Sequence, residues 1–135
     1  DNIPPLGERY CTASANSTGG PARLDAAGSS SASAADLALT SRPVPNMPGI
    51  FLHGSERSDI PFGDGRLCTR GDLRRSAIVA AGANLASYTY DRSDAQHDLA
   101  PFVGQTRHFQ HWFRDPAAGG AGFNLSDALA ISILP

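Results

Sequence analysis

The hydrophobic positions of this chain fall in short segments that either alternate with polar residues or run apolar for a few positions. Gly and Pro separate these segments throughout the chain, which limits the length of any regular element. Segments of this kind are typical of the strands of an all-β sandwich. Strands are expected at residues 22–27, 36–40, 49–53, 66–69, 77–80, 85–90, 106–114 and 128–133.

The pattern predicts an antiparallel β-sandwich, Ig-like or jelly-roll-like, with about eight short strands and long Gly/Pro-rich loops. The abundance of Ala favours helix instead. However, residues 33–37 and 126–129 are long enough only for single helical turns, and neither segment has the apolar stripe of a packed helix. We expect an extended N-terminal segment at residues 1–9 and a single β-sandwich domain at residues 10–135.

The chain of 135 residues carries 11 basic and 13 acidic side chains, for a formal net charge of −2. Because there is no basic excess to neutralise phosphates, nucleic-acid binding is not expected. No apolar run approaches the ~18 residues of a membrane helix, so membrane insertion is not expected either. Every basic residue is Arg, and all but two acids are Asp. A planar Arg fork and a short Asp stem suit fixed ion pairs that hold loops together.

Cys11 and Cys68 lie 57 residues apart and fit no metal-binding spacing. Such a pair is typical of a disulfide that joins two distant strands or loops, with two buried free thiols as the alternative. Disulfides persist in oxidising compartments, so we expect a secreted protein, extracellular or on the cell surface. The first residue is not Met, which indicates a mature secreted chain or an excised extracellular domain. Asn16 and Asn124 each begin a glycosylation sequon.

Three motifs are spread along the chain from residue 10 onward. They are Tyr10-Cys11 followed by 16–19 (NSTG), 60–65 (IPFGDG) followed by Leu67-Cys68, and 109–116 (FQHWFRDP) continuing through 119–129 (GGAGFNLSDAL). Together they resemble a module found at the C-termini of extracellular proteins of planctomycetes and other large-genome bacteria. The resemblance covers residues 10–135.

The resemblance implies a secreted β-rich domain, and it supports the pairing of Cys11 with Cys68 because the cysteines of that group sit in the same two motifs. It implies no established activity and no catalytic residues. A chain that is complete as it stands would depart from the usual appended arrangement, which would favour a self-standing surface or assembly role.

The predicted strand at 106–114 offers the best candidate binding surface. Its side chains alternate, so Phe109, His111 and Phe113 share an apolar face that we expect to be the core face. The other face combines an aromatic plane with planar hydrogen-bonding groups, which is what stacking on a sugar ring requires. Its residues are the ligand-binding candidates His108, Gln110, Trp112 and Arg114.

The alternative interpretation of this face is structural. In that interpretation Trp112 packs under a neighbouring loop, and Arg114 pairs with Asp115 or Asp127. Arg114, Asp115 and Asp127 are then expected to lock the Gly-rich segment 114–129 through charge-assisted hydrogen bonds.

Candidate metal ligands are few. Asp59 and Asp64, beside a Gly-Asp-Gly turn, could hold Ca²⁺, which takes several oxygen ligands. Residues 91, 94 and 98 form a second acidic group, but neither group has the spacing of an EF-hand or of a calcium-binding repeat. Turn formation by Asp is the alternative for both. His108 and His111 point to opposite faces of a strand and cannot share a metal there. No other cofactor is expected.

We expect no enzymatic activity. The chain has no Gly-x-Ser-x-Gly elbow, its Gly-rich segment lacks the Lys of a P-loop, and the sequence neighbours His53, Ser55 and Glu56 form a triad only if the fold assembles them. The expected function is a secreted non-catalytic module that attaches to an extracellular polymer or surface, with carbohydrate as one candidate. The alternative is a structural subunit that self-assembles into a filament or surface layer, with residues 1–8 adding a strand to another copy. A small hydrolase is the third hypothesis.

Overall fold

The computed structural model describes residues 6–135, and this part of the chain is all-β. Its helical segments are the single 3-10 turns η1 (Ala95–His97), η2 (Ala100–Phe102) and η3 (Pro116–Ala118), and no helix within residues 6–135 could cross a membrane. The strands are β1 (Glu8–Tyr10), β2 (Arg23–Ala27), β3 (Leu37–Arg42), β4 (Pro48–Gly54), β5 (Glu56–Phe62), β6 (Gly65–Arg70), β7 (Arg74–Arg75), β8 (Val79–Ala80), β9 (Ala86–Tyr90), β10 (Thr106–Arg114) and β11 (Phe123–Ser132).

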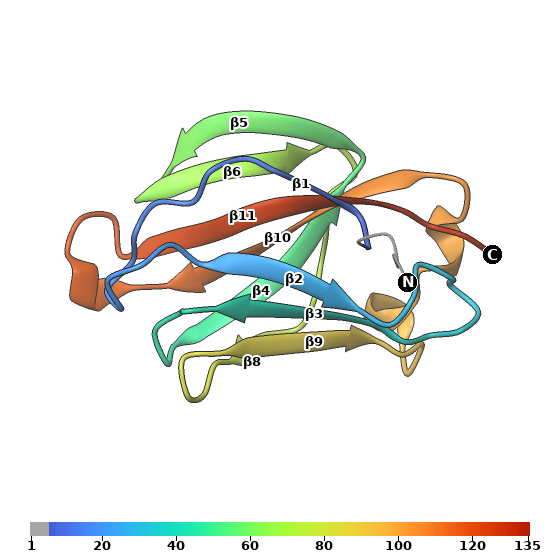
Figure 1. The fold of residues 1–135 in the computed structure, drawn as a ribbon, viewed down its shortest axis with the longest axis horizontal. Coiled ribbons are helices and arrows are strands. Elements are labelled where there is room, and N and C mark those ends of the chain that lie inside the picture. Colours follow the sequence, from blue (N-terminus) through green and yellow to red (C-terminus); the bar gives the residue numbers. More distant parts are fainter. Residues whose placement is uncertain (1–5) are drawn as a thin grey trace, which may run out of the picture.

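Two antiparallel sheets pack face to face, which confirms the β-sandwich (Figure 1). The larger sheet has the order β1-β11-β10-β4-β7, with β8 also paired to β4, and the smaller has the order β2-β3-β9. Alternate residues point between the sheets, so Tyr88 and Tyr90 of β9 are buried whereas Thr89 is exposed. Both sheets contribute to one core that includes Leu24, Leu37, Leu39, Phe51, Phe109, Phe113 and Ile131.

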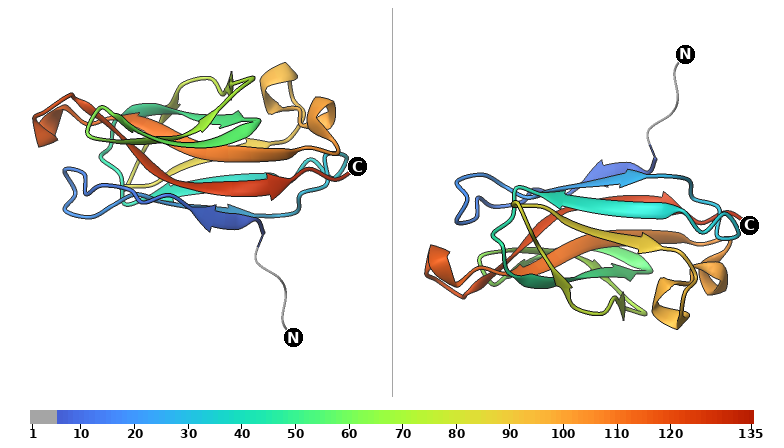
Figure 2. Two further views of the ribbon diagram at one scale, coloured as in Figure 1. Left: turned by 90° about the horizontal axis from the view of Figure 1, so that it is seen from above. Right: turned by 90° about the horizontal axis from the view of Figure 1, so that it is seen from below.

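The hairpin of β5 and β6 forms a third layer on the outer face of the larger sheet (Figure 2). The Cys11–Cys68 disulfide joins it to the segment after β1, with a Cα–Cα distance of 6.4 Å. The side chain of Gln110 in β10 lies beneath the hairpin and forms hydrogen bonds with it. Its Oε1 accepts from the Cys68 N–H (2.9 Å), and its Nε2 donates to the carbonyls of Arg66 (2.8 Å) and Ser126 (2.7 Å). The hairpin therefore covers the first half of β10.

Most of the predicted strands are found, and β10 has the predicted bounds. The segment 114–129 differs from the prediction of a Gly-rich loop leading to a turn, because β11 already begins at Phe123. The polar residues of this segment are part of the strand and form hydrogen bonds in the interior instead of making a turn. For example, the Ser126 Oγ accepts from the His111 N–H at 2.9 Å. Strands β1, β5 and β7 were not expected. Of the predicted N-terminal segment 1–9, Glu8 and Arg9 lie in β1, whereas residues 1–5 lie outside the described part.

Arg9 closes the sandwich along the edge between β1 and β2. Its Nη1 donates to the Leu24 carbonyl (2.8 Å) and to the Asp127 carboxylate (2.7 Å), and its Nη2 donates to Asp25 (2.8 Å). Asp127 in turn accepts from the Leu24 N–H (2.8 Å), and its own N–H donates to the Ala22 carbonyl (3.2 Å). Both backbone groups of Leu24 in β2 are thereby bonded, one to Asp127 of β11 and the other to Arg9.

Candidate functional site

Cross-strand pairing gathers an aromatic ring, an aliphatic side chain and two cations on the outer face of the larger sheet. Trp112 of β10 lies opposite Ile50 of β4. Arg114, two residues after Trp112, points to the same face and lies opposite Phe123 of β11. Arg75 of β7 pairs with the β4 residue two positions after Ile50, so it shares this face as well. The tip of the hairpin β5–β6 reaches this end of the face, where Phe62 contacts Trp112 and Phe123.

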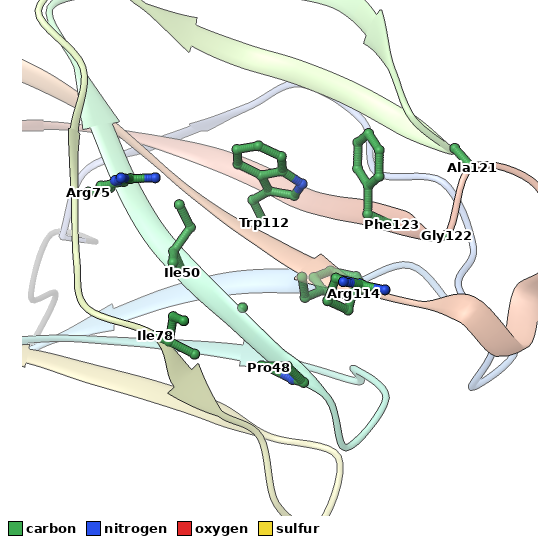
Figure 3. A pocket seen from close by; sticks show the side chains of 11 residues that line it. Pro48, Ile50, Arg75, Ile78, Trp112, Arg114, Ala121, Gly122 and Phe123 are labelled. Carbon is green, nitrogen blue, oxygen red and sulfur yellow. The ribbon is translucent and has the colours of Figure 1, made fainter.

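These residues line an open groove of about 580 Å³ (Figure 3). Its floor and walls are mainly apolar, and Ile78 at its rim is 77 % exposed. In Figure 3 the indole of Trp112 stands between the guanidinium groups of Arg75 and Arg114. The lining consists of Pro48, Gly49, Ile50, Arg75, Ile78, Trp112, Phe113, Arg114, Ala121, Gly122 and Phe123.

Trp112 is held in one orientation but is only half-buried. Phe62 of the hairpin packs edge-on against its ring at a centroid distance of 5.1 Å, and Phe123 packs at 5.7 Å. Phe62 and Phe123 also contact each other at 5.1 Å, so the three rings form a closed cluster. The indole Nε1 takes part in no hydrogen bond within residues 6–135. The groove therefore presents a fixed aromatic surface.

The four ligand-binding candidates predicted on β10 are divided between two environments. Trp112 and Arg114 line the groove, whereas His108 and Gln110 lie beneath the hairpin with exposed fractions of 7 % and 0 %. His108 bonds the Gly54 carbonyl through its Nδ1 (3.3 Å) and packs edge-on against Tyr10. Burial lowers the pKa of His108. Both buried residues connect the layers and do not face the groove.

Asp115 and Asp127 hold loops, but with partners other than Arg114. Asp115 is fully buried and accepts from the Ser17 N–H at 2.9 Å, and Asp127 pairs with Arg9. No ion pair found in residues 6–135 includes Arg114. The arginine that was expected to lock the loop thus has its charge free in the groove.

The two candidate calcium ligands are not brought into one cluster. Among the described residues, the one group of three metal-ligating types is Cys11, Asp59 and Cys68, and its two cysteines are already joined in the disulfide. Asp59 pairs with Arg66 on the neighbouring strand. Asp64 accepts from the Ala121 N–H at 2.9 Å, which ties the hairpin tip to the loop at the rim of the groove.

The second acidic group forms turns and a helix cap. Asp91 accepts from the Ser93 N–H, Asp94 caps η1, and Asp98 accepts from the Ala100 N–H and pairs with Arg92. Each carboxylate is bonded to backbone close by in the sequence, which is the turn chemistry expected of Asp.

The side chains of His53 and Glu56 have separate partners, so these two residues and Ser55 do not form a hydrogen-bonded triad. The Nδ1 of His53 accepts from the buried Arg107 Nε at 2.9 Å, whereas Glu56 pairs with Arg70 on the hairpin. Burial, with help from the positive charges of Arg107 and Arg74, lowers the pKa of His53 to about 3. His53 is therefore a neutral imidazole that serves as an acceptor for Arg107.

His111 is a second neutral histidine within the core. It is 1 % exposed and lies against Phe51 with ring centroids 4.5 Å apart, while its Nδ1 bonds the Ser41 Oγ at 2.8 Å. Burial lowers its pKa to about 3. His111 and His108 point to opposite faces of β10, as the strand pattern predicts.

Sequence reasoning missed the groove residues that do not lie on β10. Arg75 belongs to a strand of two residues, too short for any pattern of alternation. Phe123 follows a Gly-rich stretch, where a strand was not expected. The one usable signal was the pair of apolar residues Ile50 and Ile78, which lie within the predicted strands at 49–53 and 77–80.

Comparisons of this chain with protein-family models, with curated proteins and with solved structures each returned no match.

Proposed function

We propose that this chain is a secreted, non-catalytic module that attaches to an extracellular polysaccharide by binding it in the groove around Trp112. The observation that carries the proposal is the half-buried indole, which packs against Phe62 and Phe123 and lines the groove. A rigid aromatic surface can lie against the C–H face of a sugar ring and bury apolar area at little cost in side-chain entropy.

The shape of the groove supports a polymer rather than a small enclosed ligand. It is open to solvent on the outer face of the larger sheet, and its lining includes the exposed Ile78. Sites for small molecules usually bury most of the ligand surface. A site that is open to solvent can bind one part of a chain while the rest of the chain extends beyond it, which suits attachment to a polymer.

The expectation of a secreted protein is compatible with two features of the structure. The Cys11–Cys68 disulfide is of a kind that persists outside the cytosol, and the described part has no helix able to span a membrane. Extracellular location is part of the proposal, and it fits the class of polymer that the groove would meet.

Replacing Trp112 by Ala is expected to weaken binding to a responsive polysaccharide at least tenfold, or by about 1.4 kcal/mol, because the aromatic platform is lost. Affinity electrophoresis in gels that contain a panel of soluble polysaccharides measures the effect. The Trp112→Phe variant should retain part of the retardation because a ring remains.

The matched control is Leu73→Ala, which removes an exposed apolar side chain that does not line the groove. It should migrate like the wild-type protein on every gel. Equal retardation of wild type and Trp112→Ala on all polysaccharides that bind would contradict a role for the groove.

Self-assembly by strand addition is a second proposal, favoured by another groove of about 580 Å³ that lies beside the start of β1. It is lined by Leu6, Gly7 and Ala130 and by Leu134, which is 53 % exposed. The occupant would be residues 1–5 of a second copy. Sedimentation velocity should then show association that rises with concentration and disappears when residues 1–5 are deleted. A monomer at all concentrations would exclude it.

A further inference from the structure

The arginines of this protein are mostly neutralised by nearby carboxylates. Eight of the 11 make an ion pair within residues 6–135, from the part-buried Arg9 to the fully buried Arg107. The three without such a pair are Arg42, Arg75 and Arg114, and two of these line the groove. Unpaired positive charge is thus concentrated around Trp112.

Among residues 6–135, no carboxylate lines the groove to balance these charges. The acids closest in sequence are engaged elsewhere. Asp115, next to Arg114, is buried and bonded to the Ser17 N–H, and Asp72 pairs with Arg74 at 3.1 Å and with Arg107 at 3.5 Å. Both groove arginines therefore keep their donors for a ligand, and the guanidinium fork matches the two oxygens of a carboxylate or sulfate group.

The register of the sheet sets the distance between the Cα atoms of these two arginines. Arg75 of β7 lies two strands away from β10, and through β4 it is in register with the β10 residue four positions before Arg114. With strands about 4.8 Å apart and residues about 3.3 Å apart, their Cα atoms are about 16 Å apart. This Cα spacing, with the indole between the two side chains in Figure 3, favours a ligand of more than one sugar ring.

We propose that the ligand of this groove is an acidic polysaccharide, whose carboxylate or sulfate groups pair with Arg75 and Arg114 while a sugar ring between them stacks on Trp112. The inference rests on the proposed function of the groove as a polysaccharide site and names the chemical class of that polysaccharide. Three observations on the same groove support it. Two arginines there have no ion-pair partner within residues 6–135, no described carboxylate lines the groove, and the indole of Trp112 is held in a fixed position.

Binding of the full chain is measured against two matched pairs of polymers by affinity electrophoresis and by titration calorimetry. The first pair is polygalacturonate and its fully methyl-esterified form, which have the same backbone with and without charge. The second pair is dextran sulfate and dextran. Binding to the charged member should be at least tenfold tighter, should weaken with added salt, and should be lost with the monosaccharide galacturonate.

The variants separate charge from stacking. The double variant Arg75→Gln, Arg114→Gln should lose at least tenfold in affinity for the charged polymer, whereas Arg42→Gln, which removes an unpaired arginine outside the groove, should not change it. Both sets of side chains are exposed, so circular dichroism and thermal melting should match wild type. A preference for polygalacturonate assigns carboxylate as the recognised group, and a preference for dextran sulfate assigns sulfate.

The outcomes distinguish this inference from the proposed function. If neutral polymers bind as well as charged ones, with Trp112→Ala weakening both, the acidic specificity is wrong and the polysaccharide site stands. If the double variant and Arg42→Gln lose affinity equally, the effect is one of net charge and the inference is also wrong. If no polymer of either kind binds, both the inference and the proposed function fail.

Discussion

Acidification from pH 6 to pH 4 should lower the free energy of unfolding by about 5 kcal/mol, because His53 and His111 are buried as neutral imidazoles. Their pKa values in the folded protein are about 3, whereas an unfolded chain binds the same protons near pH 6.5. Below pH 6.5 the unfolded state therefore binds more protons than the native state. The free energy of unfolding therefore decreases as the pH is lowered from 6.5, and it levels off near the folded pKa values of about 3.

Urea unfolding followed by tryptophan fluorescence at several pH values measures this slope. The ring resonances of both histidines should also stay at their neutral positions in NMR spectra until the protein unfolds. A stability that stays constant between pH 6 and pH 4 would show that the two imidazoles protonate in the folded state.

A single substitution should remove part of this pH dependence. The His111→Phe variant keeps an aromatic ring between Phe51 and Phe113 and eliminates one titrating group, so the slope should fall by about 1.4 kcal/mol per pH unit. His97 provides the matched control because it lies in the turn η1, where its ring stacks on Tyr88, and its replacement leaves both buried histidines in place. The His97→Gln variant should keep a steep slope.

Loss of the disulfide should destabilise the fold by about 4 kcal/mol, since it closes a loop of 57 residues in the unfolded chain. The double variant Cys11→Ala, Cys68→Ala tests this in urea unfolding at neutral pH. Amide hydrogen exchange should accelerate most in β6, because the covalent link ends there, and less in β3 of the opposite sheet.

Reduction of the wild-type protein provides the control for that experiment. Dithiothreitol should lower the urea midpoint of the wild type toward that of the double variant and leave the variant itself unchanged. Equal stabilities of oxidised wild type and double variant would mean that Gln110 and the packing of the hairpin alone hold the third layer.

The sequence pattern located the strands that carry one apolar face, such as β10 and β9, because burial of that face between two sheets imposes alternation. It did not locate β5, whose residues are mostly exposed and include Pro61, a residue tolerated where a strand forms the edge of a hairpin. The start of β11 was missed because Asn124 and Ser126 are residue types that are common in turns. In the structure both are buried, and their side chains form hydrogen bonds with backbone groups of neighbouring segments.

The candidate site was predicted in part. Alternation along β10 placed Trp112 and Arg114 on one face, and both line the groove. It could not separate them from His108 and Gln110, because that division depends on where the hairpin lies across the sheet. Arg75 reaches the groove only through its pairing with β4, which is a long-range contact that a short sequence segment does not reveal.

The bonds that Arg9 and Asp127 make along β2 have a consequence for behaviour at high concentration. An exposed strand edge with free N–H and C=O groups is a template on which other chains can pair and aggregate. Here the outward groups of Leu24 and the carbonyl of Ala22 already have partners within the same molecule. These bonds leave fewer free backbone groups on this part of the β2 edge, so neighbouring copies in a concentrated solution have less of a template there on which to extend the sheet.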